Sequence, residues 1–307
     1  MKKSLIKAFA AIVIAASALS AQAQALKVST GGSGGTYSRM FKELGAACST
    51  QLQLVEVNSS GSTQNIDRLI GNEVNGAFVQ TDVLHYRGRT EDLSNVKTLV
   101  ALHPEGVHVV ALATQKEKTG GTMGFGGKLV QLNTINDLNG KVVAAAGGSF
   151  ITAQVIRLQT EIGFQVAEMK SAEDALAAVA NGTAAAAILV GGAPLGQVAG
   201  LDRNFKLLSF PEATVAKLKN VYRPAVLNYS KMGAAGIASV STDALFVTRE
   251  YKTAKFTAGL SKLRSCINEN VGELSETTGM HPAWSKVDVN NKGKWAYYSL
   301  DEVASKK

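Results

Sequence analysis

A glycine-rich turn near the start of the chain places the strongest constraint on how this polypeptide can fold. The apolar run Leu26–Ser29 precedes Gly31-Gly32-Ser33-Gly34-Gly35, and an amphipathic segment from Tyr37 to Ala47 follows. This order predicts a strand, a tight turn and a helix. The first N–H groups of a helix have no partner within it, and the helix dipole favours negative charge there. The turn is therefore typical of an anion-binding site.

We expect the anion to contact the backbone N–H groups of residues 34–37, which are Gly34, Gly35, Thr36 and Tyr37. The Thr36 hydroxyl is expected to contribute a further hydrogen bond. Glycine is expected at this turn because the backbone would need a positive φ and a close approach to the ligand, and a Cβ atom would hinder both.

The first 23 residues have the pattern of a secretory signal peptide. Lys2, Lys3 and Lys7 precede an uncharged apolar run, and Ala21-Gln22-Ala23 supplies the small residues of a cleavage site. Cleavage after Ala23 is predicted, with Ala25 as the alternative site, and a retained N-terminal anchor is the competing interpretation. No later stretch is long and apolar enough to cross a bilayer. The sequence thus predicts a periplasmic protein.

Composition excludes several classes of site. The formal net charge is +8, but the Lys and Arg residues are scattered rather than clustered, which argues against a nucleic-acid partner. The two cysteines and four histidines do not complete a zinc site, and no nucleotide-binding fingerprint is present, so neither a metal nor a cofactor is expected. In an oxidising compartment Cys48 and Cys266 are predicted to form a disulfide, with two buried free thiols as the alternative.

Apolar β-rich runs alternate with helix-period segments, which predicts an α/β fold with mainly parallel sheets. The last 57 residues read as a helical tail that begins with a helix over 251–270. Two apolar extended segments, 107–114 and 243–248, are interpreted as paired connections between two lobes. The expected division is a signal peptide at 1–23, lobe I at 24–110 plus 241–307, and lobe II at 111–240. The expected strands are 26–29, 51–57, 76–79, 98–102, 107–113, 141–146, 185–190, 205–208 and 244–248, and the expected helices before the tail are 37–47, 63–71, 151–163 and 172–181.

Three further turns resemble the first, because small residues follow a predicted strand and precede a predicted helix. They span 57–63, 146–152 and 190–194, and Pro194 suits the first turn of a helix. Ligands of open α/β sheets bind at the carboxyl ends of strands, so the four turns are expected to converge on one cleft that includes Gly191 and Gly192. Taken singly, each turn is also consistent with an ordinary strand-to-helix connection that binds no ligand. The glycine-rich segment 116–134 is predicted to be a loop.

Several motifs together resemble the TAXI family of solute receptors, the periplasmic binding proteins of a branch of TRAP transporters. The run Ser29–Tyr37 resembles the opening motif of that family. The runs Ser60–Ile66 and Val74–Val83 resemble its next two motifs in order and spacing, and His103–Val109 resembles its next strand. The likeness covers most of the chain after the signal peptide and is strongest over residues 26–110.

This resemblance implies a two-lobed type II periplasmic binding fold that closes on a small organic anion, such as a dicarboxylate, an oxo acid or an acidic amino acid. It also implies a TRAP-type membrane permease as partner, and a monomer is expected. The residues that it implies at the ligand are Thr36, Tyr37, Ser60, Ser62, Gln80 and the turn at 147–152 with Ser149, Phe150 and Thr152.

Other assignments remain open at this point. Arg223, in a segment read as irregular, is the preferred candidate among the arginines for pairing with a ligand carboxylate. A receptor for an ABC transporter or a sensor kinase is the first alternative function. An exported serine hydrolase is the second, because Gly31–Gly35 satisfies the G-x-S-x-G pattern around Ser33 and His281 lies late in the chain, as a triad histidine would.

Overall fold

The structure is a computed structural model, and it describes residues 25–117, 128–251, 253–291 and 293–300. The predicted signal peptide at residues 1–23 lies outside this part of the chain. No helix within the described part has the length and apolarity needed to span a membrane.

The helices and strands alternate along most of the chain, as the sequence predicts. The strands are β1 (Leu26–Ser29), β2 (Leu54–Val57), β3 (Gly76–Gln80), β4 (Val96–Leu112), β5 (Gln115–Glu117), β6 (Lys128–Val130), β7 (Val142–Ala146), β8 (Gln165–Met169), β9 (Ala186–Gly191), β10 (Phe205–Leu207), β11 (Arg223–Tyr229) and β12 (Ala234–Arg249). The α-helices are α1 (Thr36–Ala47), α2 (Ser62–Ile70), α3 (Thr81–Arg87), α4 (Gly147–Thr160), α5 (Ala172–Ala180), α6 (Gly196–Ala199), α7 (Glu212–Leu218) and α8 (Ala254–Glu276), with short 3-10 helices at Ile135–Leu138 and Pro282–Lys286.

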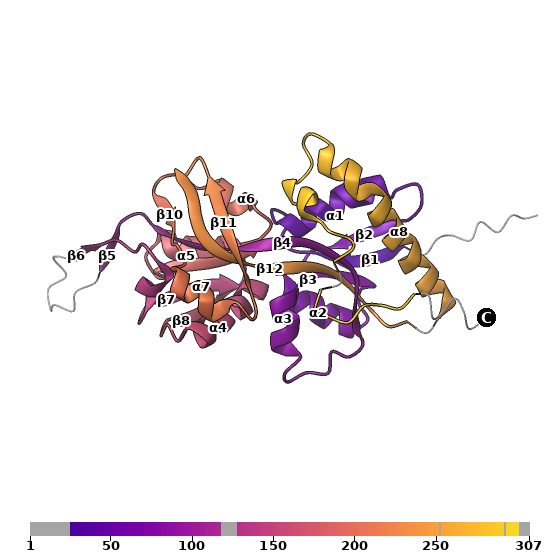
Figure 1. The fold of residues 1–307 in the computed structure, drawn as a ribbon, viewed down its shortest axis with the longest axis horizontal. Coiled ribbons are helices and arrows are strands. Elements are labelled where there is room, and N and C mark those ends of the chain that lie inside the picture. Colours follow the sequence, from indigo (N-terminus) through magenta and orange to yellow (C-terminus); the bar gives the residue numbers. More distant parts are fainter. Residues whose placement is uncertain (1–24, 118–127, 252, 292, 301–307) are drawn as a thin grey trace, which may run out of the picture.

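Two groups of parallel strands are joined by two long antiparallel strands. The main path through the sheet is β2-β1-β3-β12-β4-β9-β7-β8. β1 runs parallel to β2 and β3, and β7 runs parallel to β8 and β9, whereas β12 and β4 run antiparallel to each other and to their outer neighbours. Figure 1 shows β4 and β12 crossing between two lobes, each with helices packed around its part of the sheet.

The crossing strands are longer than the sequence analysis predicts. The segments 98–102 and 107–113 are expected as separate strands because of Pro104, but they form the single 17-residue strand β4. Pro104 is exposed and its Cα lies opposite Asp243 of β12, beside an irregularity in the register. A proline interrupts a ladder least at such a bulged position, where an N–H donor is not required. The connection between the lobes is thus a continuous two-stranded ribbon.

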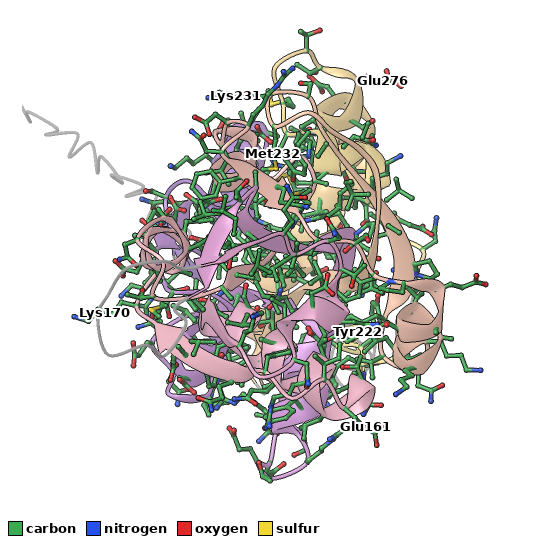
Figure 2. All side chains as sticks on the ribbon, turned by 90° about the vertical axis from the view of Figure 1, so that its left-hand side faces the viewer. Glu161, Lys170, Tyr222, Lys231, Met232 and Glu276 are labelled. Carbon is green, nitrogen blue, oxygen red and sulfur yellow. A yellow bond between two sulfur atoms is a disulfide. The ribbon has the colours of Figure 1, made fainter. Side chains whose placement is uncertain are left out.

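Continuous apolar runs mark the strands that are buried in the core of each lobe. β3 is buried along its whole length, and β9 is buried except at one position, as expected for strands covered by helices on both faces. Lobe I has a core in which residues of α1, β3 and α8 pack together, and lobe II has cores on the two faces of β7 and β9. Many charged side chains lie at the surface; Figure 2 labels Glu161, Lys170 and Glu276, which are all exposed.

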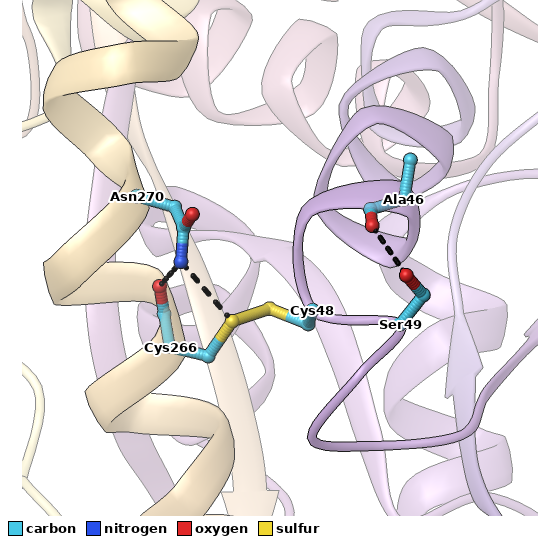
Figure 3. The surroundings of a disulfide bond; sticks show 5 residues. All are labelled: Ala46, Cys48, Ser49, Cys266 and Asn270. Carbon is cyan, nitrogen blue, oxygen red and sulfur yellow. Dashed lines mark hydrogen bonds between the residues drawn. A yellow bond between two sulfur atoms is a disulfide. The ribbon is translucent and has the colours of Figure 1, made fainter.

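The C-terminal helix α8 packs back onto the first helix. A disulfide joins Cys48, at the end of α1, to Cys266 in the middle of α8, with a Cα–Cα distance of 6.0 Å (Figure 3). The predicted disulfide is therefore confirmed. Asn270, one turn further along α8, donates to the Cys266 carbonyl oxygen over 2.8 Å. Beyond α8, Trp284 is buried and its Nε1 donates to Glu43 Oε2 of α1 over 2.6 Å.

Three local predictions were wrong. The segment around Arg223 is not irregular, because β11 begins there and pairs antiparallel with β12. Pro194 does not begin a helix: its peptide bond with Ala193 is cis, and α6 starts at Gly196. The expected loop at 116–134 contains paired strand, since β5 and β6 run antiparallel; residues 118–127 lie outside the described part. Half-exposed strands such as β11 lack the apolar run that marks a buried strand, so the sequence pattern did not indicate it.

Candidate functional site

A cavity of about 100 Å³ lies where the carboxyl ends of β1, β3, β7 and β9 meet. Its wall combines three glycine- and serine-rich turns with side chains from both lobes. The lining residues are Gly31, Gly32, Gly35, Thr36, Tyr37, Ser60, Gly61, Ser62, Gln80, Glu105, Ala146, Gly148, Ser149, Ala172, Leu189, Val190, Gly191, Leu195 and Gln197. This is the position at which open α/β sheets bind ligands.

Three helices of eight residues or more direct their N-termini at this cavity. α1 and α2 come from lobe I and α4 comes from lobe II, and the first turn of each contributes lining residues. None of the three has an acidic residue in its first turn, and no side chain caps its first N–H groups. The free N–H groups and the helix dipoles therefore make this end of the cavity favourable for an anionic group.

Glycine is essential where the two lobes approach each other. Gly147 has φ +52°, and a Cβ atom there would overlap the backbone oxygen of Ser60 across the cleft. Gly61, the residue before α2, has φ +117°. By contrast, Gly35 has φ −87°, so the expectation that the first turn needs a positive φ was wrong. A Cβ atom at Gly35 would still lie 3.2 Å from the oxygen of Gly32, which is a tight contact.

One buried acidic side chain lines the cavity. Glu105 on β4 is 2% exposed, and its Oε2 accepts a 2.7 Å hydrogen bond from the Tyr37 hydroxyl. Burial, together with the negative charge of Glu105, raises the pKa of Tyr37 well above its usual value of 10.0, so Tyr37 stays protonated as a donor. His103 Nε2 lies 3.6 Å from Glu105 Oε1, beyond hydrogen-bond distance. The sequence analysis missed Glu105 as a site residue; its signal was an acidic residue between the apolar runs 99–102 and 109–112 of β4.

A second buried carboxylate, Asp82 of α3, joins the lobes beside the cavity. Its Oδ2 accepts hydrogen bonds of 2.7 Å from Thr152 of α4 and from Tyr222, and its Oδ1 accepts one of 3.2 Å from Thr242 of β12. Burial raises the pKa of Asp82 above 3.8, although the hydrogen bonds from Thr152, Tyr222 and Thr242 act in the opposite direction. The network holds α3 and α4 together across the cleft.

The structure brings most of the predicted site residues together. Those that line the cavity are Gly35, Thr36, Tyr37, Ser60, Ser62, Gln80, Ser149 and Gly191. Within this group Ser62 Oγ donates to Gln80 Oε1 over 3.3 Å, and Ser149 Oγ accepts from the Val190 N–H over 3.0 Å. The expected convergence of turns from both lobes is therefore observed, and contact of these residues with a ligand stays a prediction.

Other predicted site residues lie outside the cavity wall. Thr152 faces Asp82, and Phe150 packs against the core of lobe II. The carbonyl oxygen of Gly192 accepts a 3.4 Å hydrogen bond from Thr36 Oγ1, so Gly192 supports the wall from behind. Gly34 does not line the cavity either; a Cβ atom there would lie 3.8 Å from Gln197 Nε2.

Arg223 is engaged elsewhere. Its guanidinium pairs with Asp243, and its side chain is 57% exposed. The arginine therefore has a partner within the protein and does not reach the cavity wall. No lysine or arginine is among the lining residues.

The described residues assemble neither a catalytic triad around Ser33 nor a metal-binding cluster. Ser33 is exposed in its turn, and no hydrogen bond joins it to a histidine in this part of the chain. His281 Nδ1 instead accepts a 3.0 Å hydrogen bond from the Ala283 N–H. In the described residues no three His, Cys, Asp or Glu side chains are placed to hold a metal ion.

Comparison with known proteins agrees with this architecture. The model of the NMT1-like family matches residues 28–288. A solved mutant of ArgBP from T. maritima is similar to this chain with a TM-score of 0.50 and 15% identity, over 81% of this chain and 90% of that one. A substrate binding protein of an amino acid ABC transporter aligns with a TM-score of 0.49 and 11% identity, over 81% and 94%. No curated protein sequence matches. The fold is the two-lobed α/β fold of type II periplasmic binding proteins, as predicted.

Proposed function

This chain belongs to the NMT1-like family, and we propose that it is an extracytoplasmic receptor that captures a small organic anion between its two lobes. The observation that carries the proposal is the convergence of the N-termini of α1, α2 and α4, from both lobes, on one small cavity. A ligand held by both lobes stabilises their closed arrangement, which a membrane partner can recognise.

The chemistry of the cavity supports binding of a carboxylate. Uncapped helix N-termini present several N–H donors, and the hydroxyls of Thr36, Ser60 and Ser62 lie beside them. Donors of this kind satisfy carboxylate oxygens without an arginine. A cavity of about 100 Å³ suits a ligand of few atoms.

The proposed membrane partner is a TRAP-type permease, because the motifs of residues 26–110 resemble those of TAXI receptors. The alternative is a receptor that serves an ABC transporter or a sensor kinase. Inspection of the neighbouring genes separates the two proposals. A multi-span TRAP permease encoded beside this gene supports the first, and an ATPase with its own permease supports the second.

We propose that the protein binds its organic anion without converting it to a product. A hydrolase that used Ser33 would need a histidine in hydrogen-bond reach of the hydroxyl, and the described residues provide no such contact. Labelling of Ser33 by a fluorophosphonate probe would contradict the proposal.

A thermal-shift screen followed by calorimetry tests this function. The screen compares organic acids and amino acids, because a ligand that binds only the folded state raises the melting temperature by mass action. We expect at least one compound to raise it and to bind with one-to-one stoichiometry, and mass spectrometry should recover that compound unchanged. Failure of every compound to bind, or recovery of a chemically altered compound, would overturn the proposal.

A further inference from the structure

The cavity carries one formal charge of its own, and that charge is negative. Glu105 is the only acidic residue among the lining residues, and none of them is a lysine, an arginine or a histidine. The N-termini of α1, α2 and α4 favour an anionic group in the cavity, whereas Glu105 disfavours one next to its own carboxylate. A ligand that satisfies both must itself carry charges of both signs.

The hydrogen bonding of Glu105 is incomplete within the protein. A carboxylate has about four acceptor positions. Among the described residues this one accepts a single hydrogen bond, from the Tyr37 hydroxyl at 2.7 Å, and His103 Nε2 lies 3.6 Å from its other oxygen, beyond hydrogen-bond distance. Because Glu105 is only 2% exposed, bulk water does not donate hydrogen bonds to its remaining acceptor positions. A buried carboxylate with so few donors is unfavourable unless a ligand supplies more.

A second acceptor in the cavity wall also lacks a hydrogen-bond donor. Gln197 lines the cavity, and its Oε1 atom is buried without a hydrogen-bond partner. Its Nε2 donates to Glu173 Oε1 over 3.4 Å, which orients the amide with its oxygen free. Two acceptors without sufficient donors, one of them charged, therefore belong to residues of the same cavity wall.

We infer that Glu105 is a specificity-determining residue that binds the ammonium group of the ligand, so that the ligand is an α-amino acid rather than a dicarboxylate or an oxo acid. This inference rests on the proposed receptor function and narrows its ligand class. The ligand carboxylate lies at the helix N-termini and its ammonium group donates to Glu105, with Gln197 as a further acceptor. The hydroxyl of Tyr37 holds the carboxylate of Glu105 in place through its 2.7 Å hydrogen bond.

Matched pairs of ligands test the inference on the unmodified protein. Calorimetry compares glutamate with 2-oxoglutarate, alanine with pyruvate, and each of the remaining common L-amino acids that raises the melting temperature with its oxo acid. In each pair the ammonium group is the main difference. We expect at least one amino acid to bind at least 100-fold more tightly than its oxo acid.

Variants then assign the preference to one side chain. Glu105→Gln should lower the affinity for that amino acid at least 30-fold and reduce its advantage over the oxo acid to less than 10-fold. Tyr37→Phe, which keeps the charge, should retain the preference at a lower affinity. Glu168→Gln is the matched control, because Glu168 is exposed on β8 and does not line the cavity.

The possible failures separate the two proposals. If an oxo acid or a dicarboxylate binds as tightly as the matched amino acid, or is bound when no amino acid is, the inference about Glu105 is wrong and the receptor function stands. If Glu105→Gln folds and keeps the full preference, the inference is also wrong. If no organic acid or amino acid binds, both proposals are overturned.

Discussion

A buried histidine supports the wall of the cavity from within lobe II. The distance from His108 Nδ1 to the Leu189 carbonyl oxygen is 3.3 Å, and Nε2 lies 2.7 Å from the Tyr229 hydroxyl. The same hydroxyl accepts a 2.7 Å hydrogen bond from the Leu195 N–H. Leu189 and Leu195 both line the cavity, so this chain of hydrogen bonds positions two parts of its wall. It suits a neutral imidazole with its proton on Nδ1.

Burial lowers the pKa of His108 from 6.5 to about 4, and this shift makes folding pH-dependent. Below pH 6.5 His108 binds a proton in the unfolded chain, whereas in the folded protein it binds one only near pH 4. The contribution of neutral His108 to the free energy of unfolding is therefore fully present above pH 6.5 and is lost as the pH falls toward 4. We expect His108 to lower the free energy of unfolding by roughly 2 kcal/mol between pH 7 and pH 5.

Urea unfolding at the two pH values measures this loss. His108→Gln supplies the comparison, because glutamine cannot take up a proton. Its stability should fall less between pH 7 and pH 5 than that of the unmodified protein. Identical falls in the two proteins would show that His108 does not titrate in this way.

At the scale of elements, the N-terminus of α4 in lobe II closely approaches the backbone of lobe I. Gly147 and Gly148 lie against Ser60 in the turn before α2, Ser62 at the start of α2 and Gln80 at the end of β3. A Cβ atom at Gly147 would meet backbone rather than a flexible side chain, and the φ of +52° is unfavourable for any other residue. The approach of the two lobes depends on this absence of a side chain.

We expect Gly147→Ala to weaken ligand binding at least 10-fold, about 1.4 kcal/mol or more, because the closed arrangement can no longer form without a shift of α4. Calorimetry with the tightest-binding compound of the screen measures the effect. Gly45→Ala is the matched control, since Gly45 lies within α1 with open space where its Cβ atom would be. Normal affinity in a folded Gly147→Ala protein would show that closure does not require the contact seen here.

At the scale of the whole molecule, lobe I is assembled from the two ends of the described chain. α8 packs against α1, and the disulfide between Cys48 and Cys266 closes a loop of 218 residues that contains all of lobe II. The two crossing strands β4 and β12 then link the lobes at a single ribbon. The disulfide therefore cross-links two helices of lobe I and makes no covalent link to lobe II.

We expect the double variant Cys48→Ser and Cys266→Ser to lower the free energy of unfolding by roughly 2–5 kcal/mol, because the cross-link restricts the unfolded chain over a long loop. Urea unfolding measures this change, and reduction of the unmodified protein should reproduce it. Ligand affinity should change little, since neither cysteine lines the cavity. An unchanged unfolding midpoint would mean that packing of α8 alone holds lobe I together.

Much of the architecture follows from the sequence alone. The sequence predicted the alternation of strands and helices and the glycine-rich turn before α1, because both depend on neighbours along the chain. It also predicted the pairing of Cys48 with Cys266, because the chain has only two cysteines. Strands with continuous apolar runs, such as β3 and β9, were found for the same reason. Half-exposed strands such as β8 and β11 carry no such run and were missed.

Only the tertiary structure decided which buried charged residues lie in and beside the cavity and which partners they have. Glu105 meets Tyr37 from 68 residues away, and Asp82 meets Tyr222 from 140 residues away. Arg223, the preferred arginine, pairs instead with Asp243 on the neighbouring strand. Local sequence patterns set the conformation of each segment, but burial and partners are set by packing between segments distant in the chain. The turns were therefore predictable, whereas the charge that they enclose was not.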